Sequence, residues 1–134
     1  MEPNKSPDVV FRFPRDNTAP AQARRALSEL FEPGDPIAEA VTMSASELVT
    51  NVVLHTEGGG EMRTWDPKPD VPLRLEIEDT SPGAPTVMPD QAERVTGRGL
   101  RILNSLADSW GTFGTKVGKV VWAEFDRTKP RSGV

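Results

Sequence analysis

The stretch Ser46-Glu47-Leu48-Val49-Thr50-Asn51-Val52-Val53-Leu54-His55 decides how the rest of this chain is interpreted. Most of its residues are apolar, which predicts the C-terminal half of a largely buried helix that starts near Asp35. Glu47, Asn51 and His55 follow one another at intervals of four residues, so they share one face of that helix. An unpaired polar group in a protein core costs roughly 1–3 kcal/mol. We therefore expect this polar stripe to face a ligand or another polar group.

Length and composition describe a single globular domain. The chain has 134 residues, a common size for a domain with one hydrophobic core. Its residues are 36% hydrophobic and 27% charged, which is typical of a folded rather than a disordered protein. The net charge of −4 argues against nucleic acid as the main ligand, because proteins that bind nucleic acid usually carry a basic surplus.

The residue types exclude several kinds of chemistry. With no cysteine, the chain has no disulfide, no thiolate catalysis and no cysteine zinc site, and its single histidine cannot form a histidine metal cluster. The polar N-terminus lacks the apolar segment of a signal peptide. No apolar run approaches the roughly 20 residues that a membrane span needs. We therefore expect a cytoplasmic protein that does not interact with membranes.

Hydrophobic periodicity predicts an α+β fold, a two-layer α/β sandwich. We expect a mixed, mostly antiparallel sheet with helices on one face. In one strand Leu73, Leu75 and Ile77 would face the core, whereas Arg74, Glu76 and Glu78 would face solvent. The expected strands are residues 9–13, 61–65, 73–78, 110–115 and 120–125, and the expected helices are residues 19–31, 36–55 and 100–109. The domain would span residues 8–126, between disordered tails at residues 1–7 and 127–134.

Two further polar features accompany the helical stripe. Asp79-Thr80-Ser81-Pro82-Gly83 follows a core strand, where an acid can accept a hydrogen bond from a ligand amine. Gly97-Arg98-Gly99 opens a helix after the irregular segment 84–96, and a helix N-terminus offers unpaired N–H groups to phosphate. The oxygen of a buried Asn51 suits a hard cation such as Mg²⁺.

In order and spacing, these features resemble the GHKL ATPase and kinase superfamily with its Bergerat ATP-binding fold, and especially its anti-sigma factor serine kinases. The resemblance covers about residues 8–126. The matching segments are Glu47–Asn51 with His55 (the N box), Asp79–Gly83 and Gly97–Leu100 (the two glycine boxes), Arg12–Pro14 (the opening strand) and Lys119–Phe125 (the closing strand).

The resemblance implies a role for each matching residue. Glu47 would be the general base acting on a serine hydroxyl, Asn51 would coordinate Mg²⁺, and Asp79 would bind the adenine amino group. The implied cofactors are ATP and Mg²⁺, and the implied nucleotide-binding residues are Asn51, Asp79, Gly83, Gly97, Arg98, Gly99 and Leu100. The implied protein partners are a sigma factor, which the kinase sequesters as a homodimer, and an anti-sigma factor antagonist of the STAS type, which it phosphorylates.

Two positions depart from the family pattern. The first glycine box usually has glycine where this chain has Ser81, and the closing strand commonly has threonine where this chain has Val120. That threonine hydroxyl would support the adenine-binding acid. These departures motivate an alternative, a degenerate anti-sigma module that binds its partner without kinase activity, with or without ATP.

Other readings also remain open. One is a histidine-kinase-type catalytic domain, and another is a scaffold that binds no nucleotide. Taken alone, Glu47 could be a surface carboxylate and Asn51 a structural amide. His55 fits a charge at a helix C-terminus better than a catalytic group.

Overall fold

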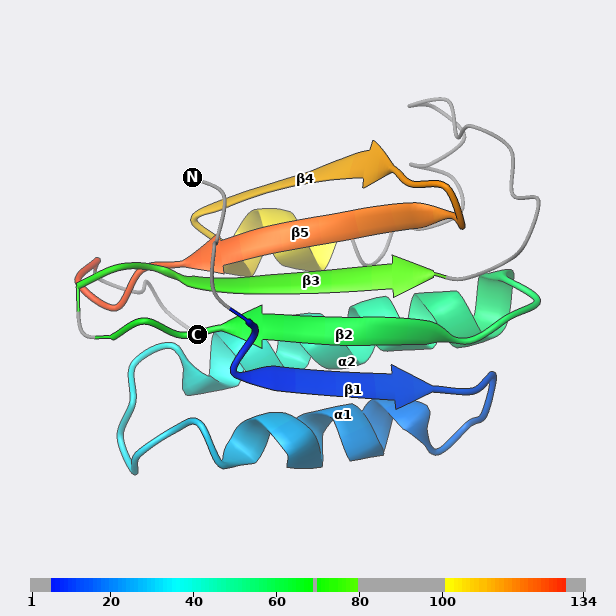
Figure 1. Cartoon of the computed structure of the whole chain (residues 1–134). Helices are drawn as coiled ribbons and strands as arrows, with labels where there is room; N and C mark the ends of the chain where they lie inside the picture. The colour runs from blue at the N-terminus through cyan, green and yellow to red at the C-terminus, as the bar shows by residue number, and fades with distance from the viewer. Residues whose placement is uncertain (1–5, 69, 80–100, 130–134) are drawn as a thin grey trace.

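Alternating apolar and polar residues build one five-stranded sheet in the computed structural model (Figure 1). The structure describes residues 6–68, 70–79 and 101–129. The strands are β1 (Val9–Phe13), β2 (Gly60–Trp65), β3 (Leu73–Asp79), β4 (Ser109–Gly114) and β5 (Lys119–Phe125). They lie in the order β1-β2-β3-β5-β4, and every neighbouring pair is antiparallel. The expected α+β fold is therefore confirmed, but among the described strands the sheet is antiparallel rather than mixed.

The helices lie together on one face of this sheet (Figure 1). They are α1 (Ala19–Ser28), α2 (Ala38–His55) and a short helix at residues 101–106. Helix α2 lies against the central strands, and α1 packs beside it and near β1. This arrangement gives the predicted two layers, with the core between α2 and the sheet.

Both long helices are shorter than the periodicity predicted. Helix α1 ends at Ser28 because the next amides make tighter bonds: Leu30 N donates to Leu27 O at 2.9 Å, and Phe31 N to Ser28 O at 3.4 Å. Helix α2 begins two residues after Pro36. Before it, Asp35 Oδ1 accepts a hydrogen bond from Ile37 N at 3.1 Å, which closes a turn ahead of the helix.

The core face of the sheet follows the predicted alternation. Leu73, Leu75 and Ile77 are buried beneath the helices. Helix α2 contributes Val41, Ala45, Leu48, Val49 and Val52. Burying each large aliphatic side chain contributes about 1.5–3 kcal/mol. This apolar layer therefore fixes how α2 lies on β3.

The opposite face of the sheet carries paired charges rather than isolated solvated ones. Arg63 Nη1 lies 3.0 Å from Glu78 Oε1, and Arg74 Nε lies 2.9 Å from Glu76 Oε2. The Arg74 guanidinium also stacks 4.6 Å from the ring centroid of Trp122. As a result Glu76 is only 9% exposed, although it points away from the helices as predicted.

Arg127 ties the chain after β5 to two distant loops. Its Nη2 lies 2.9 Å from Asp35 Oδ2 and its Nη1 lies 2.8 Å from Asp66 Oδ1. The two carboxylate side chains are only 6% and 1% exposed. Hydrogen bonds to both carboxylates raise the pKa of Arg127 despite its burial. Arg127, which the sequence placed in a disordered tail, is therefore bound to the domain.

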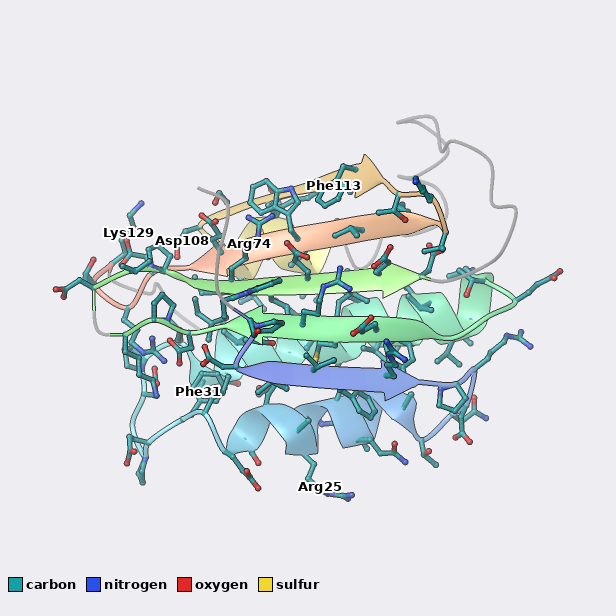
Figure 2. The ribbon with its side chains drawn as sticks, viewed as in Figure 1. Arg25, Phe31, Arg74, Asp108, Phe113 and Lys129 are labelled. Atoms are coloured by element: carbon teal, nitrogen blue, oxygen red, sulfur yellow. The ribbon has the colours of Figure 1, made fainter. Side chains whose placement is uncertain are left out.

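Replacing Arg127 by alanine should lower the free energy of unfolding by about 3–5 kcal/mol, because it leaves two buried carboxylates uncompensated. Urea denaturation followed by circular dichroism would measure this change. The matched control is Arg25→Ala, since Arg25 extends from α1 into solvent (Figure 2) and should change stability by less than about 0.5 kcal/mol. Equal stability of the two variants would contradict a structural role for Arg127.

Candidate functional site

A small cavity lies between the C-terminal half of α2 and the adjoining ends of β3 and β5. Its volume is about 30 Å³. This is room for about two water molecules, so the cavity could form only the deep end of a larger ligand site. The lining residues are Leu48, Asn51, Val52, His55, Thr56, Ile77, Asp79, Lys119 and Val121.

Asn51 brings an amide to this cavity from α2. Its Nδ2 atom is buried, and no hydrogen-bond partner for it is found among the described residues. A buried donor left unpaired costs about 1–3 kcal/mol. The fold therefore keeps a polar atom at the cavity that a ligand or a water molecule can satisfy.

Asp79 reaches the same cavity from the last position of β3. Strand alternation places it on the helix side with Leu75 and Ile77, and it is only 6% exposed. Its cross-strand partner is Lys119, which therefore lies on the same face and also lines the cavity. Burial lowers the pKa of Lys119, while the negative charge of Asp79 acts in the opposite direction.

The position that we expected to support Asp79 was assigned wrongly. Val120 pairs with Glu78, so its side chain lies on the face of the sheet opposite Asp79. A threonine hydroxyl at position 120 would point away from the carboxylate. The side chain beside Asp79 is Lys119, a residue that the sequence reading did not select.

Gly118 allows the backbone to approach Asp79 closely. A Cβ atom at this position would collide with Asp79 Oδ1 and with the Asp79 carbonyl. Glycine is therefore required here by contact with the acid. Gly118 was not among the site residues selected from the sequence. The alternation of Lys119, Val121, Ala123 and Phe125 could have indicated that the start of β5 faces this site.

Glu47 and His55 occupy the same helix but different surroundings. His55, the last residue of α2, is exposed and lines the cavity. Glu47 is half-buried and does not line it. It precedes Asn51 by one helical turn, about 6 Å along the axis. Ser44, which lies three residues before Glu47 on the same helix, is fully buried. The stripe therefore runs from the core to the cavity.

Comparison with known families agrees with this arrangement. A family described as "Histidine kinase-like ATPase domain" matches residues 13–125. The chain belongs to this family. Among curated proteins, no match is found. The family confirms the expected relationship to GHKL ATPases, and the matched residues contain all five strands except the first four residues of β1.

Several residues of the two glycine boxes, which the resemblance implies for the nucleotide site, lie outside the described part of the chain. They are Ser81, Gly83, Gly97, Arg98, Gly99 and Leu100. The cavity of this histidine kinase-like ATPase domain therefore contains two of the predicted nucleotide-binding residues, Asn51 and Asp79. These come from segments far apart in the sequence, and the packing of α2 on β3 brings them together.

The amide oxygen of Asn51 could serve as one ligand of a magnesium ion shared with a phosphate group. Within residues 6–68, 70–79 and 101–129, no three His, Cys, Asp or Glu side chains are grouped to hold a metal. Mg²⁺ commonly takes few protein ligands and completes its shell with water and substrate phosphates. A single amide oxygen can take part in such shared coordination, but it cannot by itself form a metal site made only of protein ligands.

Within residues 6–68, 70–79 and 101–129, no helix is long and apolar enough to cross a bilayer.

Replacing Gly118 by alanine should destabilise the domain by about 1–3 kcal/mol, because the new methyl group overlaps Asp79 and forces the strand ends apart. Chemical denaturation would measure the loss. Gly114→Ala is the matched control, because a Cβ there has no atom within 4 Å. If Gly118→Ala were as stable as the control, close contact between the turn and Asp79 would be refuted.

Proposed function

We propose that this chain binds ATP with Mg²⁺ and phosphorylates a serine of an anti-sigma factor antagonist, and that it sequesters a sigma factor when the antagonist is absent. One observation carries the nucleotide part of this proposal. Asn51 from α2 and Asp79 from β3 line one cavity in a histidine kinase-like ATPase domain. The resemblance of the N box and glycine boxes to anti-sigma factor kinases supports the choice of protein partners.

Asp79 would hold the adenine. A carboxylate that is 6% exposed and faces a cavity can accept a hydrogen bond from the adenine amino group with little competition from bulk water. Gly118 keeps the backbone of the β4–β5 turn close behind this acid. The acid is therefore oriented before a ligand arrives.

Asn51 would act on the phosphate side of the site. Its amide oxygen would coordinate Mg²⁺, which when bound neutralises charge on the phosphates of ATP. Leu48 and Val52 are buried where α2 packs on the sheet, and this packing holds the backbone of Asn51 at the cavity. The helix thus positions the amide rather than leaving it on a mobile side chain.

Glu47 would accept the proton of the partner's serine hydroxyl. Being half-buried and one turn from Asn51, it lies near the cavity but outside its lining, where a protein substrate can approach it. General-base catalysis of this kind typically contributes 10²–10⁴-fold. Most of the remaining rate would come from positioning and charge stabilisation, as in other phosphoryl transfers.

Asn51→Ala should weaken Mg²⁺-dependent ATP binding by about tenfold or more, a change of at least about 1.4 kcal/mol, because it removes the metal-binding oxygen. Calorimetric titration with and without Mg²⁺ would measure it. Asn17→Ala, at an exposed asparagine before α1, is the control and should bind as the wild type does. Unchanged affinity in a folded Asn51→Ala protein would remove Asn51 from the site.

Glu47→Gln should reduce phosphate transfer to the antagonist by about 10²-fold or more while ATP affinity stays the same, because only the base is lost. Transfer would be followed with labelled ATP and a candidate antagonist protein. The matched control is Glu39→Gln, which changes an exposed acid two turns earlier on α2. Transfer at the wild-type rate by Glu47→Gln would refute the base assignment.

Lys119 favours a second candidate function, sequestration of the partner without phosphorylation. Its ammonium group lies within electrostatic reach of Asp79, where it would compete with a ligand amine for the carboxylate. An ATP titration followed by the transfer assay separates the two functions. The kinase requires both binding and transfer, whereas the second candidate requires partner binding with no transfer by the wild-type chain.

A further inference from the structure

Among the strands that the structure describes, β4 lies at one edge of the sheet, and its own residues include none of the types that usually prevent strand pairing. Its sequence, Ser-Trp-Gly-Thr-Phe-Gly at residues 109–114, contains no charged residue and no proline. Among the described strands, its only neighbour is β5. Phe113 is 46% exposed, and Figure 2 shows its ring at this outer strand. Open edges of this kind are sites of strand pairing.

The other edge strand is protected in the usual ways. Strand β1 contains the charged Arg12 and is flanked by Pro7, Asp8 and Pro14. Prolines and charges at an edge prevent strand addition. The contrast between the two edges points to β4 as the surface available for pairing.

Backbone geometry shows which groups of β4 face outward. Thr115 N donates to Gly118 O at 2.8 Å, in the same register as the β4–β5 pairs. Because bonding alternates along an antiparallel strand, the odd-numbered positions of β4 bond to β5. The N–H and C=O groups of Trp110, Thr112 and Gly114 therefore point away from β5, toward the open edge.

We propose that β4 pairs antiparallel with β4 of a second copy of this chain, with the two-fold axis at Thr112. In this register Thr112 meets Thr112, Trp110 meets Gly114, and Gly111 meets Phe113. All the outward-facing backbone groups then face one another. Each aromatic side chain also lies opposite a glycine, so the two strands fit without two large rings colliding.

The sheet already contains one such pair of an aromatic residue and a glycine. Gly111 lies opposite Trp122, and a Cβ at Gly111 would be 2.8 Å from the indole nitrogen of Trp122. The ring thus fills the space over the glycine. In the pairing proposed here, Phe113 of the second copy reaches Gly111 from the other side and extends the same aromatic row.

Charges at the two ends of β4 complement one another in this register. Antiparallel pairing brings the Asp108 end of one strand to the Lys116 end of the other, twice in the dimer. The Asp108 carboxylate is held in place, since its Oδ2 accepts a hydrogen bond from Asp126 N at 2.6 Å. Lys116 is exposed. The sheets of the two copies become continuous, with both helical layers on the same side.

Cysteine cross-linking tests the register directly, because the chain has no cysteine of its own. Across a hydrogen-bonded antiparallel pair the Cα atoms lie about 5.5 Å apart, within the range that a disulfide can span. Thr112→Cys should therefore form a disulfide-linked dimer under mild oxidation. Val10→Cys, at an exposed position of β1 away from the proposed interface, should form little disulfide-linked dimer. Equal cross-linking of both variants, or none with Thr112→Cys, would overturn the proposal.

Sedimentation at micromolar concentration gives a second test without oxidation. The wild type should be dimeric. Thr112→Lys should be monomeric because two ammonium groups would meet at the axis, whereas Val10→Lys should remain dimeric. Circular dichroism would establish that each variant is folded. A monomeric wild type, or a dimeric Thr112→Lys protein, would overturn the interface.

The experiments distinguish an error in the β4 interface from an error in the proposed kinase function. A monomeric wild type that still transfers phosphate would refute only the β4 pairing. A wild-type dimer through β4 that binds no ATP would refute only the nucleotide part of the proposed function.

Discussion

The packing of α2 against the core face of β3 and β5 is the interaction on which the rest of the structure depends. It buries the apolar stripe of the helix and, in the same step, holds Asn51 over the strand ends where Asp79 and Lys119 meet. A buried helix with one unsatisfied amide is unfavourable by itself. Burial of the surrounding apolar side chains offsets that cost in free energy. The polar site can therefore persist in the folded protein.

Charged side chains have different partners in three parts of the domain. On the open face of the sheet, Arg63 and Arg74 are each paired with acids of neighbouring strands. At the end of the sheet where β2 and β5 finish, Arg127 joins two nearly buried carboxylates from distant loops. At the cavity, Lys119 and Asp79 face each other across two strands. The first two arrangements satisfy their charges within the protein, whereas the third leaves a polar group of Asn51 beside it for a ligand.

Periodicity predicted the elements well where one face of a strand or helix is buried. The alternation in β3 gave the correct inward and outward residues, because a one-residue shift would expose the whole apolar set. The end of α1 was predicted less well. Leu30 and Phe31 continue the apolar pattern but form tighter backbone bonds, and periodicity does not distinguish a final tight turn from another helical turn.

In the candidate site, too, the sequence identified some residues and missed others. Residue type and spacing were enough to select Asn51 and Asp79, since a polar residue in a buried helix and an acid at a strand end need a physical reason. Neither feature could identify Lys119, because its place beside Asp79 depends on the register between β3 and β5. The same register shows that Val120 faces the other side of the sheet.

By itself, the sequence determined the two-layer fold, the family resemblance and the polar residues of α2, because these follow from local periodicity and residue chemistry. Only the tertiary structure decided which distant groups meet. It placed Lys119 beside Asp79, joined Arg127 to Asp35 and Asp66, and put β4 at the edge of the sheet among the described strands. Such contacts depend on strand order and register, which are set by the packing of the whole domain rather than by any one segment.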